Sequence, residues 1–344
     1  MSSSTTGGTS ADFRKIPVSK DRNNVTGKNN QKMSFRLSKS VMPIRGITLS
    51  ECDLSLFVAI SFSAILPCYQ LAFFHVFVRI FLLNAPFSKV YCVDTGAHAG
   101  EENMEFDRRI MAAFLDGRFQ QKFGQQSSLW RFYAWRPYAI TLGYNQPSSG
   151  IDTEKCRQAG VDVVRRPTGG RAVYHADEFT YSFFSDSSEQ NSEIYRMVHE
   201  VIQQALEPLG IHAEFCRSTL QRSQGAQNAG SVSCFTASAK YELQVAGKKL
   251  VGSAQRKTRN VLLQHGSLPL SGRHKELCRF IAFSEESDLE NIREEMERKT
   301  ISLEEILGYI PQYDLLTELM HSALRSLHGT NVEVLHPDQL SDIL

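Results

Sequence analysis

Cys234 stands out among the chemically reactive side chains of this sequence. It lies in Gly230-Ser231-Val232-Ser233-Cys234-Phe235, after a polar stretch rich in Gly, Gln, Asn and Ser. A cysteine thiolate is a strong nucleophile, and a neighbouring cation favours the thiolate over the thiol. Two lysines, Lys248 and Lys249, follow on the next expected hairpin. Cys234 is therefore less typical of a core residue than Cys92 or Cys216, and the residues alone leave open a reactive thiolate and a small buried side chain.

A glycine pair lies inside a second, arginine-rich segment, Arg165-Arg166-Pro167-Thr168-Gly169-Gly170-Arg171-Ala172-Val173-Tyr174-His175. One strand is expected to end near Pro167, and another is expected to begin after the glycines. Gly169 and Gly170 let the backbone approach a ligand closely, and their N–H groups suit an acyl carbonyl or a phosphate. The alternative is a hairpin turn beside a solvated arginine pair, and the residues alone leave both interpretations open.

The third segment is Gly247-Lys248-Lys249-Leu250-Val251-Gly252-Ser253-Ala254-Gln255. A lysine beside a strand is usually solvated. The run Gly252-Ser253-Ala254, however, places small residues inside an expected strand, which indicates close approach by another chain or a ligand. Because adjacent strand residues face opposite ways, only one of Lys248 and Lys249 can reach such a ligand.

Periodic apolar segments that can position these residues begin at Val90 and continue to the C-terminus. Strands are expected at residues 90–93, 129–135, 138–142, 161–164, 179–184 and 261–263, with a turn at His265-Gly266. Residues 241–245 and 249–254 flank Ala246-Gly247-Lys248 and predict a β-hairpin. Helices are expected at 103–115 and 194–209 and through the C-terminal third, where Ser302-Leu303-Glu304-Glu305 forms a capping box. Strands and helices interleave without regular βαβ spacing, which favours an α+β fold: a mostly antiparallel or mixed sheet packed against helices.

Composition places the chain among globular proteins. It has 344 residues, 42% of them hydrophobic, and 38 Lys or Arg against 37 Asp or Glu. These values exclude collagen, a coiled coil and a wholly disordered chain. The near-zero net charge gives no general attraction to nucleic acid, and no such partner is expected. The seven cysteines show neither a CxxC pair nor a metal-ligand spacing, so they predict free thiols in a reducing compartment and no metal site.

The first 88 residues differ from the rest. Residues 1–50 carry nine Lys or Arg and two Asp among many Ser, Thr, Asn and Gly, so a disordered basic extension is expected. Residues 51–88 form a hydrophobic segment of uncertain status. Its stretch 54–78 has no Asp, Glu, Lys or Arg and is long enough to span a bilayer, but Pro67 and two polar side chains weaken that interpretation.

Other interpretations of this start remain open. The region is a poor signal peptide because its basic part is too long, whereas a transit peptide or a later translation start fits its composition. We expect no membrane contact. The expected location is cytoplasmic, or an organellar matrix if the start is a transit peptide.

The three segments, together with others and in this order, resemble the superfamily of lipoate–protein ligases, octanoyltransferases and biotin ligases. The glycine segment is similar to the family signature RRxTGGxAVxH, and Lys249 matches the lysine of GxKxxGSAQ. The other similar segments are Val90–Gly96, Asn103–Asp107, Trp135-Arg136-Pro137 with Thr141–Gln146, and His265-Gly266. The resemblance covers about residues 89–270. It is weakest to the biotin ligases, whose loop reads GRGRxG.

Within the superfamily, the chain is most similar to lipoate-ligase-like octanoyltransferases that have a catalytic cysteine. The features shared with that subgroup are Gly169–His175, Glu178–Ser182, and Cys234-Phe235 ahead of Tyr241-Glu242-Leu243. In this subgroup the cysteine is the acyl acceptor. The resemblance therefore implies that Cys234 and Lys249 are catalytic, and that residues 89–344 form an acyltransferase catalytic domain with C-terminal helices.

The resemblance also implies the reaction and its partners. An octanoyl group is expected to pass from octanoyl-acyl carrier protein to a lysine of a lipoyl domain or of the glycine-cleavage H protein, in protein lipoylation. No cofactor is expected, because exchange between thioesters needs no ATP. Arginines near the site are expected to steer the protein partners. The substrate-binding residues are expected to be Arg165, Arg166, Thr168, Gly169, Gly170, Arg171, His175, Gly252, Ser253 and Ala254.

Two alternatives remain at this stage. In an ATP-dependent lipoate–protein ligase, Lys249 would bind an acyl-adenylate, ATP and Mg²⁺ would be required, and Cys234 would be incidental. In a non-catalytic acyl-binding or carrier-docking protein, neither residue would be needed. The joint presence of Lys249 and Cys234 argues against the second alternative.

Overall fold

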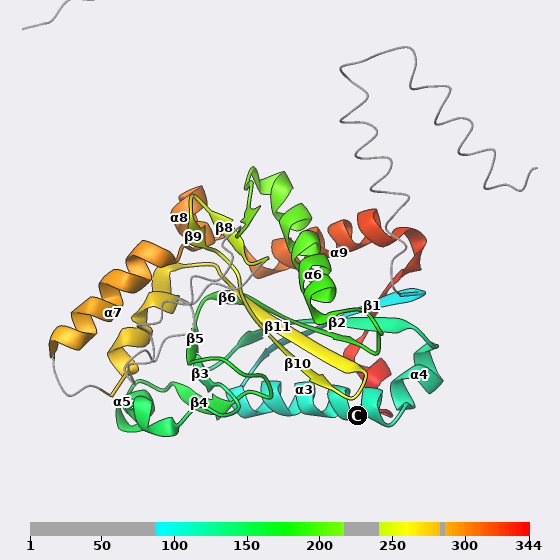
Figure 1. Cartoon of the computed structure of the whole chain (residues 1–344), viewed down its shortest axis with the longest axis horizontal. Helices are drawn as coiled ribbons and strands as arrows, with labels where there is room; N and C mark the ends of the chain where they lie inside the picture. The colour runs from blue at the N-terminus through cyan, green and yellow to red at the C-terminus, as the bar shows by residue number, and fades with distance from the viewer. Residues whose placement is uncertain (1–86, 217–240, 283–285) are drawn as a thin grey trace, which may run out of the picture. The chain divides into compact units, whose positions relative to one another are not determined.

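A computed structural model describes residues 87–216, 241–282 and 286–344, all within one compact unit, Leu71–Leu344 (Figure 1). The basic extension expected at 1–50, the apolar stretch 54–78 and Cys234 lie outside the described residues. Within the three described ranges, no helix combines the length and the apolar character needed to cross a membrane. Phe87, the first described residue, is already buried in the core.

A six-stranded mixed sheet organises these residues, in the order β10-β11-β6-β2-β1-β12. Strand β1 is parallel to both of its neighbours, whereas β2, β6, β11 and β10 pair antiparallel. Such a mixed sheet packed against helices confirms the expected α+β class. The strand bounds are β1 Lys89–His98, β2 Ser127–Trp135, β6 Glu178–Ser185, β10 Gly252–Thr258, β11 Val261–Pro269 and β12 Val332–Leu335.

The helices arise where apolar residues recur at helical spacing. The expected capping box opens α8: the Glu305 N–H donates to Ser302 Oγ at 3.4 Å, and the Ser302 N–H donates to the Glu305 carboxylate at 2.9 Å. Gly210, with φ 74°, follows the last turn after α6 as the glycine spacing predicts. The α-helix bounds are α3 Gly100–Leu115, α4 Arg118–Phe123, α5 Thr153–Gln158, α6 Asn191–Leu206, α7 Glu286–Lys299, α8 Leu303–Leu307 and α9 Tyr313–His328.

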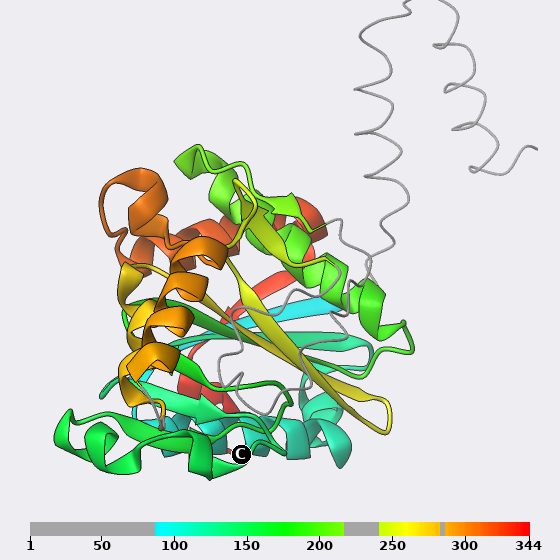
Figure 2. The same ribbon diagram turned by 60° about the vertical axis from the view of Figure 1, so that its left-hand side comes forward.

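The large sheet has two different faces because side chains alternate along each strand. Trp130 and Phe132 of β2 and Phe183 of β6 join a core cluster with residues of α6 and α9. Leu129 and Phe184, one position away, join a second cluster with residues of α3 and α4. Helices α6 and α9 therefore cover one face of the sheet, and α3 covers the other (Figures 1 and 2).

Two smaller sheets complete the described fold. In the first, β3 lies between β4, to which it is parallel, and β5, to which it is antiparallel. In the second, β8 lies between β7 and β9. The strand bounds are β3 Ala139–Leu142, β4 Asp162–Arg165, β5 Val173–His175, β7 Glu214–Phe215, β8 Leu243–Val245 and β9 Lys248–Lys249.

The predicted hairpin is confirmed around Ala246 and Gly247, whose positive φ values of 50° and 75° suit a tight turn between β8 and β9. Its second strand is shorter than expected. Strand β9 ends at Lys249, where the chain leaves this small sheet. Gly252 then begins β10, which pairs with β11 in the large sheet. The lysines and the small residues therefore belong to different sheets.

Three other expectations about local structure were wrong or incomplete. His265-Gly266 is not a turn but the middle of β11, where Gly266 pairs with both Ser253 and Tyr181. The segment around Gly169 and Gly170 is not a hairpin, since β4 and β5 both pair with β3 and not with each other. The helical C-terminal third also contains β12, which extends the sheet beside β1.

Candidate active site

A cavity of about 200 Å³ lies where residues of β2, β6, β9, β10 and β11 come together. It combines apolar and aromatic side chains with a lysine, two histidines and several hydroxyl groups. Its lining residues are Met104, Tyr133, Trp135, Thr141, Arg166, Val173, His175, Thr180, Glu242, Lys249, Gly252, Ser253, Ala254, His265, Gly266 and Ser267.

Strand register explains why this space exists. Tyr133 pairs with Thr180, Thr180 with Ser267, and Ser267 with Gly252, so one row crosses four strands. Directly paired residues of antiparallel strands share a face. The row carries a large ring on β2, two small hydroxyl side chains, and no side chain at all on β10. The small residues at the β10 end leave room for a ligand, as the sequence predicts for the run that begins at Gly252.

Lys249 and Glu242 form a buried ion pair at the cavity, with Lys249 Nζ 2.8 Å from Glu242 Oε1. The tight turn between β8 and β9 brings the two residues together, and 5% and 3% of their side chains are exposed. Lys248 lies differently, because its Nζ donates to the backbone carbonyl of Glu297 at 2.8 Å. The two adjacent lysines thus have different surroundings, and only Lys249 lines the cavity.

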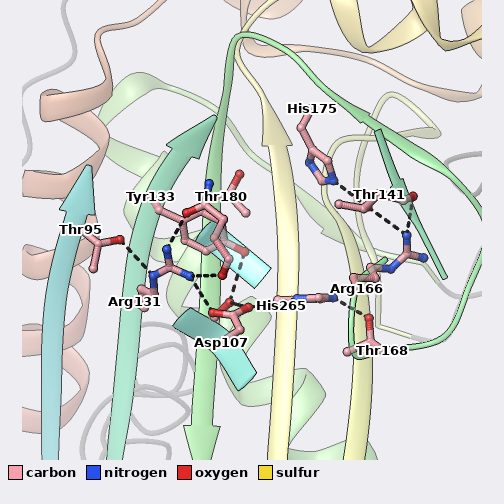
Figure 3. A network of polar contacts seen from close by, with 12 residues as sticks. Thr95, Asp107, Arg131, Tyr133, Thr141, Arg166, Thr168, His175, Thr180 and His265 are labelled. Atoms are coloured by element: carbon pink, nitrogen blue, oxygen red, sulfur yellow. Dashed lines mark hydrogen bonds and ion pairs between the residues drawn. The ribbon is translucent and has the colours of Figure 1, made fainter. Parts of the chain in front are cut away.

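A chain of buried polar groups connects α3 to the glycine segment (Figure 3). Asp107 and Arg131 form an ion pair at 2.8 Å, with both side chains fully buried. Asp107 also accepts a hydrogen bond from the Ser182 hydroxyl at 2.7 Å and lies 3.5 Å from His265 Nδ1. On the other side of the imidazole, His265 Nε2 lies 2.5 Å from the Thr168 hydroxyl.

The charges of this chain follow from its burial. Burial opposes ionisation of Asp107, but the Arg131 guanidinium and hydrogen bonds from His265 and Ser182 outweigh it, so the Asp107 pKa is below its usual value. Burial lowers the pKa of His265, against the opposing effect of Asp107. His265 is then neutral near pH 7. Its Nδ1–H faces the Asp107 carboxylate, and its Nε2 accepts a hydrogen bond from the Thr168 hydroxyl.

A second chain of the same kind lies on β5 and β6. His175 Nδ1 donates to Glu178 at 2.7 Å, and His175 Nε2 lies 2.8 Å from the Thr141 hydroxyl, which also accepts from Arg166 at 3.1 Å. Burial opposes ionisation of Glu178, but the electrostatic interaction with His175 and several hydrogen bonds outweigh it, so the Glu178 pKa is lowered. The other donors to the Glu178 carboxylate are Trp135, Thr180 and Ser267.

Arg166 fixes the backbone of the glycine segment. Its guanidinium donates to the carbonyl of Gly169 at 2.7 Å and to that of Arg171 at 2.8 Å. The neighbouring loop touches this segment so closely that a Cβ on Gly143 would lie 1.9 Å from the Gly170 carbonyl oxygen. Glycine is therefore required at position 143, because backbone atoms cannot move aside for a side chain.

A family model decides the relationship of the chain to known proteins. The model of the lipoyl protein ligase A/B catalytic domain matches residues 100–325. The chain belongs to this family. The match includes both chains of buried polar groups and the Lys249–Glu242 pair.

Similar proteins from several bacteria are named octanoyltransferase LipM. The protein of Lysinibacillus sphaericus is 34% identical over 224 residues, which cover 63% of this chain and 79% of that protein. The protein of Kyrpidia tusciae is 32% identical over 245 residues, which cover 70% and 87%. The similarity thus covers most of the length of both relatives.

Solved structures of lipoate ligases share the fold. A bi-partite lipoate protein ligase of Thermoplasma acidophilum matches with a TM-score of 0.52 and 16% identity, covering 75% of this chain and 90% of that one. LipL1 of P. falciparum, solved with lipoate, matches with a TM-score of 0.54 and 18% identity, covering 73% and 66%. At these identities the similarity shows the fold alone.

The structure distributes the predicted site residues of this family member into two groups. Six of them line the cavity: Arg166, His175, Lys249, Gly252, Ser253 and Ala254. The others, Arg165, Thr168, Gly169, Gly170 and Arg171, belong to the glycine segment but do not line the cavity, and Cys234 lies outside the described residues. Among the lining residues, Ser253 makes two side-chain hydrogen bonds. Its hydroxyl oxygen lies 2.7 Å from the Tyr181 hydroxyl and 2.8 Å from His199 Nε2. That hydroxyl thus holds β10 to α6 and β6.

The expected steering role does not fit Arg166. Only 4% of this residue is exposed, and its guanidinium is committed to backbone carbonyls. Arg165 is exposed, but it also donates to backbone carbonyls, at 2.6 Å to Gly143 and 2.8 Å to Gln146. Burial excludes the steering role for Arg166, whereas the exposed Arg165 keeps its positive charge, so for Arg165 and Arg171 steering stays a prediction.

Sequence reasoning missed the partners that hold the site together. Glu242, Asp107 and His265 were not predicted as site residues, although all three are buried at or beside the cavity. The signal that was available is a charged residue on the apolar stripe of an expected helix: Asp107 lies three residues from both Met104 and Ile110 on α3. Its partner Arg131 lies among aromatic residues on β2, which is a second such signal.

Proposed function

We propose that this protein transfers an octanoyl group from octanoyl-acyl carrier protein to a lysine of a lipoyl domain or of the glycine-cleavage H protein. The main support is the buried Lys249–Glu242 ion pair, which lines the cavity. The same cavity is also lined by Met104, Tyr133 and Trp135. A cation beside an apolar space suits a carbonyl at the head of an alkyl chain. The octanoyltransferase relatives support the same reaction.

Lys249 acts on the acyl carbonyl in this proposal. Its ammonium carries three N–H donors, one of which is directed to Glu242. Glu242 holds the ammonium in place, so that it stabilises the negative charge that develops on the carbonyl oxygen. Because the pair is shielded from water, each such contact is stronger than it would be in bulk solvent.

Cys234 is the proposed acyl acceptor. Seven residues lie between Cys234 and Glu242, so the chain keeps Cys234 within at most about 28 Å of Glu242 and the cavity that Glu242 lines. The four cysteines in the described residues, 92, 156, 216 and 278, are all buried. Burial raises the pKa of Cys92 to about 12 and that of Cys156 to about 11, which disfavours their thiolates.

Two balanced steps complete the reaction. In the first, the Cys234 thiolate attacks the thioester carbonyl of the donor, a new C–S bond forms, and the carrier's phosphopantetheine thiol leaves with a proton. In the second, the acceptor lysine amine attacks the acyl-enzyme, forms an amide bond, loses a proton and releases the cysteine thiolate. One thioester replaces another in the first step, and amide formation drives the second, so no ATP is consumed.

The alkyl chain supplies binding energy. At about 0.8 kcal/mol for each buried CH₂, the seven carbons beyond the carbonyl contribute about 5–6 kcal/mol. This energy holds the acyl group in the cavity while the carrier protein leaves and the acceptor arrives.

Intact mass spectrometry tests the proposal. The purified full chain is mixed with octanoyl-acyl carrier protein in the absence of ATP, and we expect a gain of one octanoyl group that hydroxylamine removes, as it does from thioesters. Cys234→Ser should prevent this adduct, because a serine hydroxyl is far less ionised than a thiol at neutral pH. Cys278→Ala is the matched control and should still form it.

The ligase alternative predicts the opposite pattern. It requires ATP, Mg²⁺ and free octanoate or lipoate, forms no adduct from the carrier, and tolerates Cys234→Ser. Full ATP-dependent activity of Cys234→Ser would contradict the acyl-enzyme and establish the ligase.

A further inference from the structure

A fully buried histidine on α6, His199, bonds through its two ring nitrogens to two different parts of the site. Nδ1 lies 2.7 Å from the backbone carbonyl oxygen of Tyr241, and Nε2 lies 2.8 Å from the hydroxyl oxygen of Ser253. Ser253 lines the cavity, and Tyr241 directly precedes Glu242, the partner of Lys249. His199 thus connects α6 to a lining residue and to the residue before the buried ion pair.

The hydrogen bonds allow only one arrangement of protons on this ring. A carbonyl oxygen can only accept, so His199 Nδ1–H donates to Tyr241. Burial lowers the His199 pKa to about 4, so the ring is neutral near pH 7 and its Nε2 accepts from the Ser253 hydroxyl. Ser253 in turn accepts from Tyr181, whose hydroxyl accepts from Gln264 at 3.1 Å. A flip of the imidazole would place C–H groups at both positions, so the hydrogen bonds fix its orientation.

Tyr241 has a backbone conformation that needs such a contact. Its φ of 71° lies in the left-handed region, which a residue with a Cβ rarely adopts. A conformation of this kind persists only where the surrounding structure holds it. The N–H of His199 holds the Tyr241 carbonyl, and the direction of the chain at that peptide sets where the Glu242 side chain begins.

Glu242 then determines where the charge of Lys249 lies. The backbone of Glu242 is also held from its other side, because its carbonyl accepts from the Cys216 N–H at 2.7 Å. Its carboxylate lies 2.8 Å from Lys249 Nζ. A lysine ammonium is carried on a flexible stem of four carbons. The position of this ammonium therefore depends on the carboxylate that binds it.

We infer that His199 is a positioning residue: through the Tyr241 carbonyl it fixes Glu242, and through Glu242 it fixes the Lys249 ammonium at the cavity. His199 does not itself line the cavity, so it acts only through these residues. The inference rests on the proposed function, in which Lys249 stabilises the acyl oxygen. The hydrogen bond to Ser253 holds β10 instead, so the two ring nitrogens have separate tasks.

Two amide substitutions separate these tasks. The amide nitrogen of asparagine is bonded to Cγ, as Nδ1 of histidine is, so His199→Asn keeps a donor for the Tyr241 carbonyl. The amide nitrogen of glutamine lies one bond further out, as Nε2 does. His199→Gln therefore still reaches Ser253 but leaves the Tyr241 carbonyl without its donor.

Transfer kinetics with octanoyl-acyl carrier protein provide the first readout. We expect His199→Gln to lower kcat about 10- to 100-fold, as a small misplacement of a catalytic group does, and His199→Asn to stay within about threefold of the unaltered chain. KM should change little in either variant, because the acyl oxygen gains its negative charge only in the transition state.

The contrast between the two variants decides the inference. A merely structural role of the histidine would lower the stability of both variants without separating their kcat values. Equal losses of kcat in the two variants, or an unchanged kcat in folded His199→Gln, would overturn the positioning role. If His199→Gln does not fold, His199→Met, which has no donor, makes the same comparison with His199→Asn.

A binding measurement distinguishes this inference from the proposed function. Isothermal titration with free octanoate reports the position of the Lys249 ammonium without any transfer, because the carboxylate already carries a negative charge. We expect His199→Gln to bind octanoate about tenfold more weakly than His199→Asn, which corresponds to one impaired hydrogen bond to a charged group. If the unaltered chain transfers no acyl group, the proposed function fails. Equal octanoate affinities of the two variants would reject the positioning role.

Discussion

The two faces of the six-stranded sheet use the same strands for different purposes. Towards α6 and α9, β2 and β6 present Trp130, Phe132 and Phe183, which pack against other apolar groups. Towards α3, the same strands present Arg131 and Ser182, which belong to a chain of charged and hydroxyl groups. Neighbouring residues therefore differ in what they do: the face towards α6 and α9, called here the apolar face, contributes packing, whereas the face towards α3 combines a second apolar cluster with the candidate site.

The largest expected effect is on the site side of this comparison. Lys249→Ala should lower kcat/KM for octanoyl transfer at least about 10³-fold, because the developing oxyanion loses its cation. Lys248→Ala is the matched control, and it should have little effect because Lys248 contacts a backbone carbonyl away from the cavity. Transfer kinetics with octanoyl-acyl carrier protein measure both variants.

A stability control is needed for Lys249. Removing it leaves Glu242 buried without its partner, which can cost about 3–5 kcal/mol. The double variant Lys249→Met/Glu242→Gln removes both charges and should fold while remaining inactive. Equal losses in the two single lysine variants, or an active double variant, would contradict the assignment.

The next effect lies on the apolar face. Phe183→Ala should reduce the free energy of unfolding by about 3–5 kcal/mol, because it removes a buried ring from the core. The centroid of the Phe183 ring lies 5.6 Å from that of Phe87 and 5.1 Å from that of Trp130. Denaturant unfolding measures the loss. At temperatures where the variant is folded, its kcat/KM should stay close to that of the unaltered chain. A folded variant with a large catalytic defect would show that the two faces are not separable in this way.

His199 on α6 is a titratable group on the apolar side of the sheet, and it forms a hydrogen bond with Ser253. It therefore tests whether burial on this side makes stability depend on pH. Burial lowers its pKa from 6.5 to about 4. The unfolded chain therefore binds a proton first as the pH falls, so this histidine's contribution to stability is complete above about pH 6.5 and is lost towards pH 4. The loss is about 3 kcal/mol. His199→Gln should flatten the dependence of unfolding free energy on pH in that window, and an unchanged slope would contradict the burial argument.

The smallest effect is expected from the start of the chain. The described sheet begins at Lys89 and the family match at residue 100, so a chain that begins at Ala85 should fold and transfer octanoyl groups at an unchanged rate. It keeps Phe87, which is buried against Phe183. Failure of this shorter chain to fold would show that the first 84 residues support one of the two faces.

Local sequence patterns predicted the elements well but not their neighbours. The helix expected at 194–209, observed as α6 at Asn191–Leu206, was predictable because its apolar residues recur at helical spacing, and the turn at Ala246-Gly247 was predictable from its residues. His265-Gly266 was misjudged because a glycine in a polar pair is typical of a turn. Gly266 instead makes room within β11, since a Cβ there would lie 2.4 Å from Ser253 Oγ.

The residues of the candidate site were predictable only where a single short segment of the sequence supplies them. Lys249 and the small residues of β10 are local features, and the structure places them at the cavity. The pairing of Asp107 with Arg131, or of His265 with Thr168, depends on which strands are adjacent, and strand order does not follow chain order here. No local pattern contains that information.

The contact between Gly143 and Gly170 has a consequence for motion. The Tyr144 N–H donates to the Thr168 carbonyl at 2.8 Å, and Thr168 is joined through His265 to Asp107 on α3. Direct contacts and hydrogen bonds thereby connect the loop at Gly143, the glycine segment and α3. The conformational entropy of these two loops is lost when the protein folds, so a ligand that binds beside them orders little of these loops on arrival.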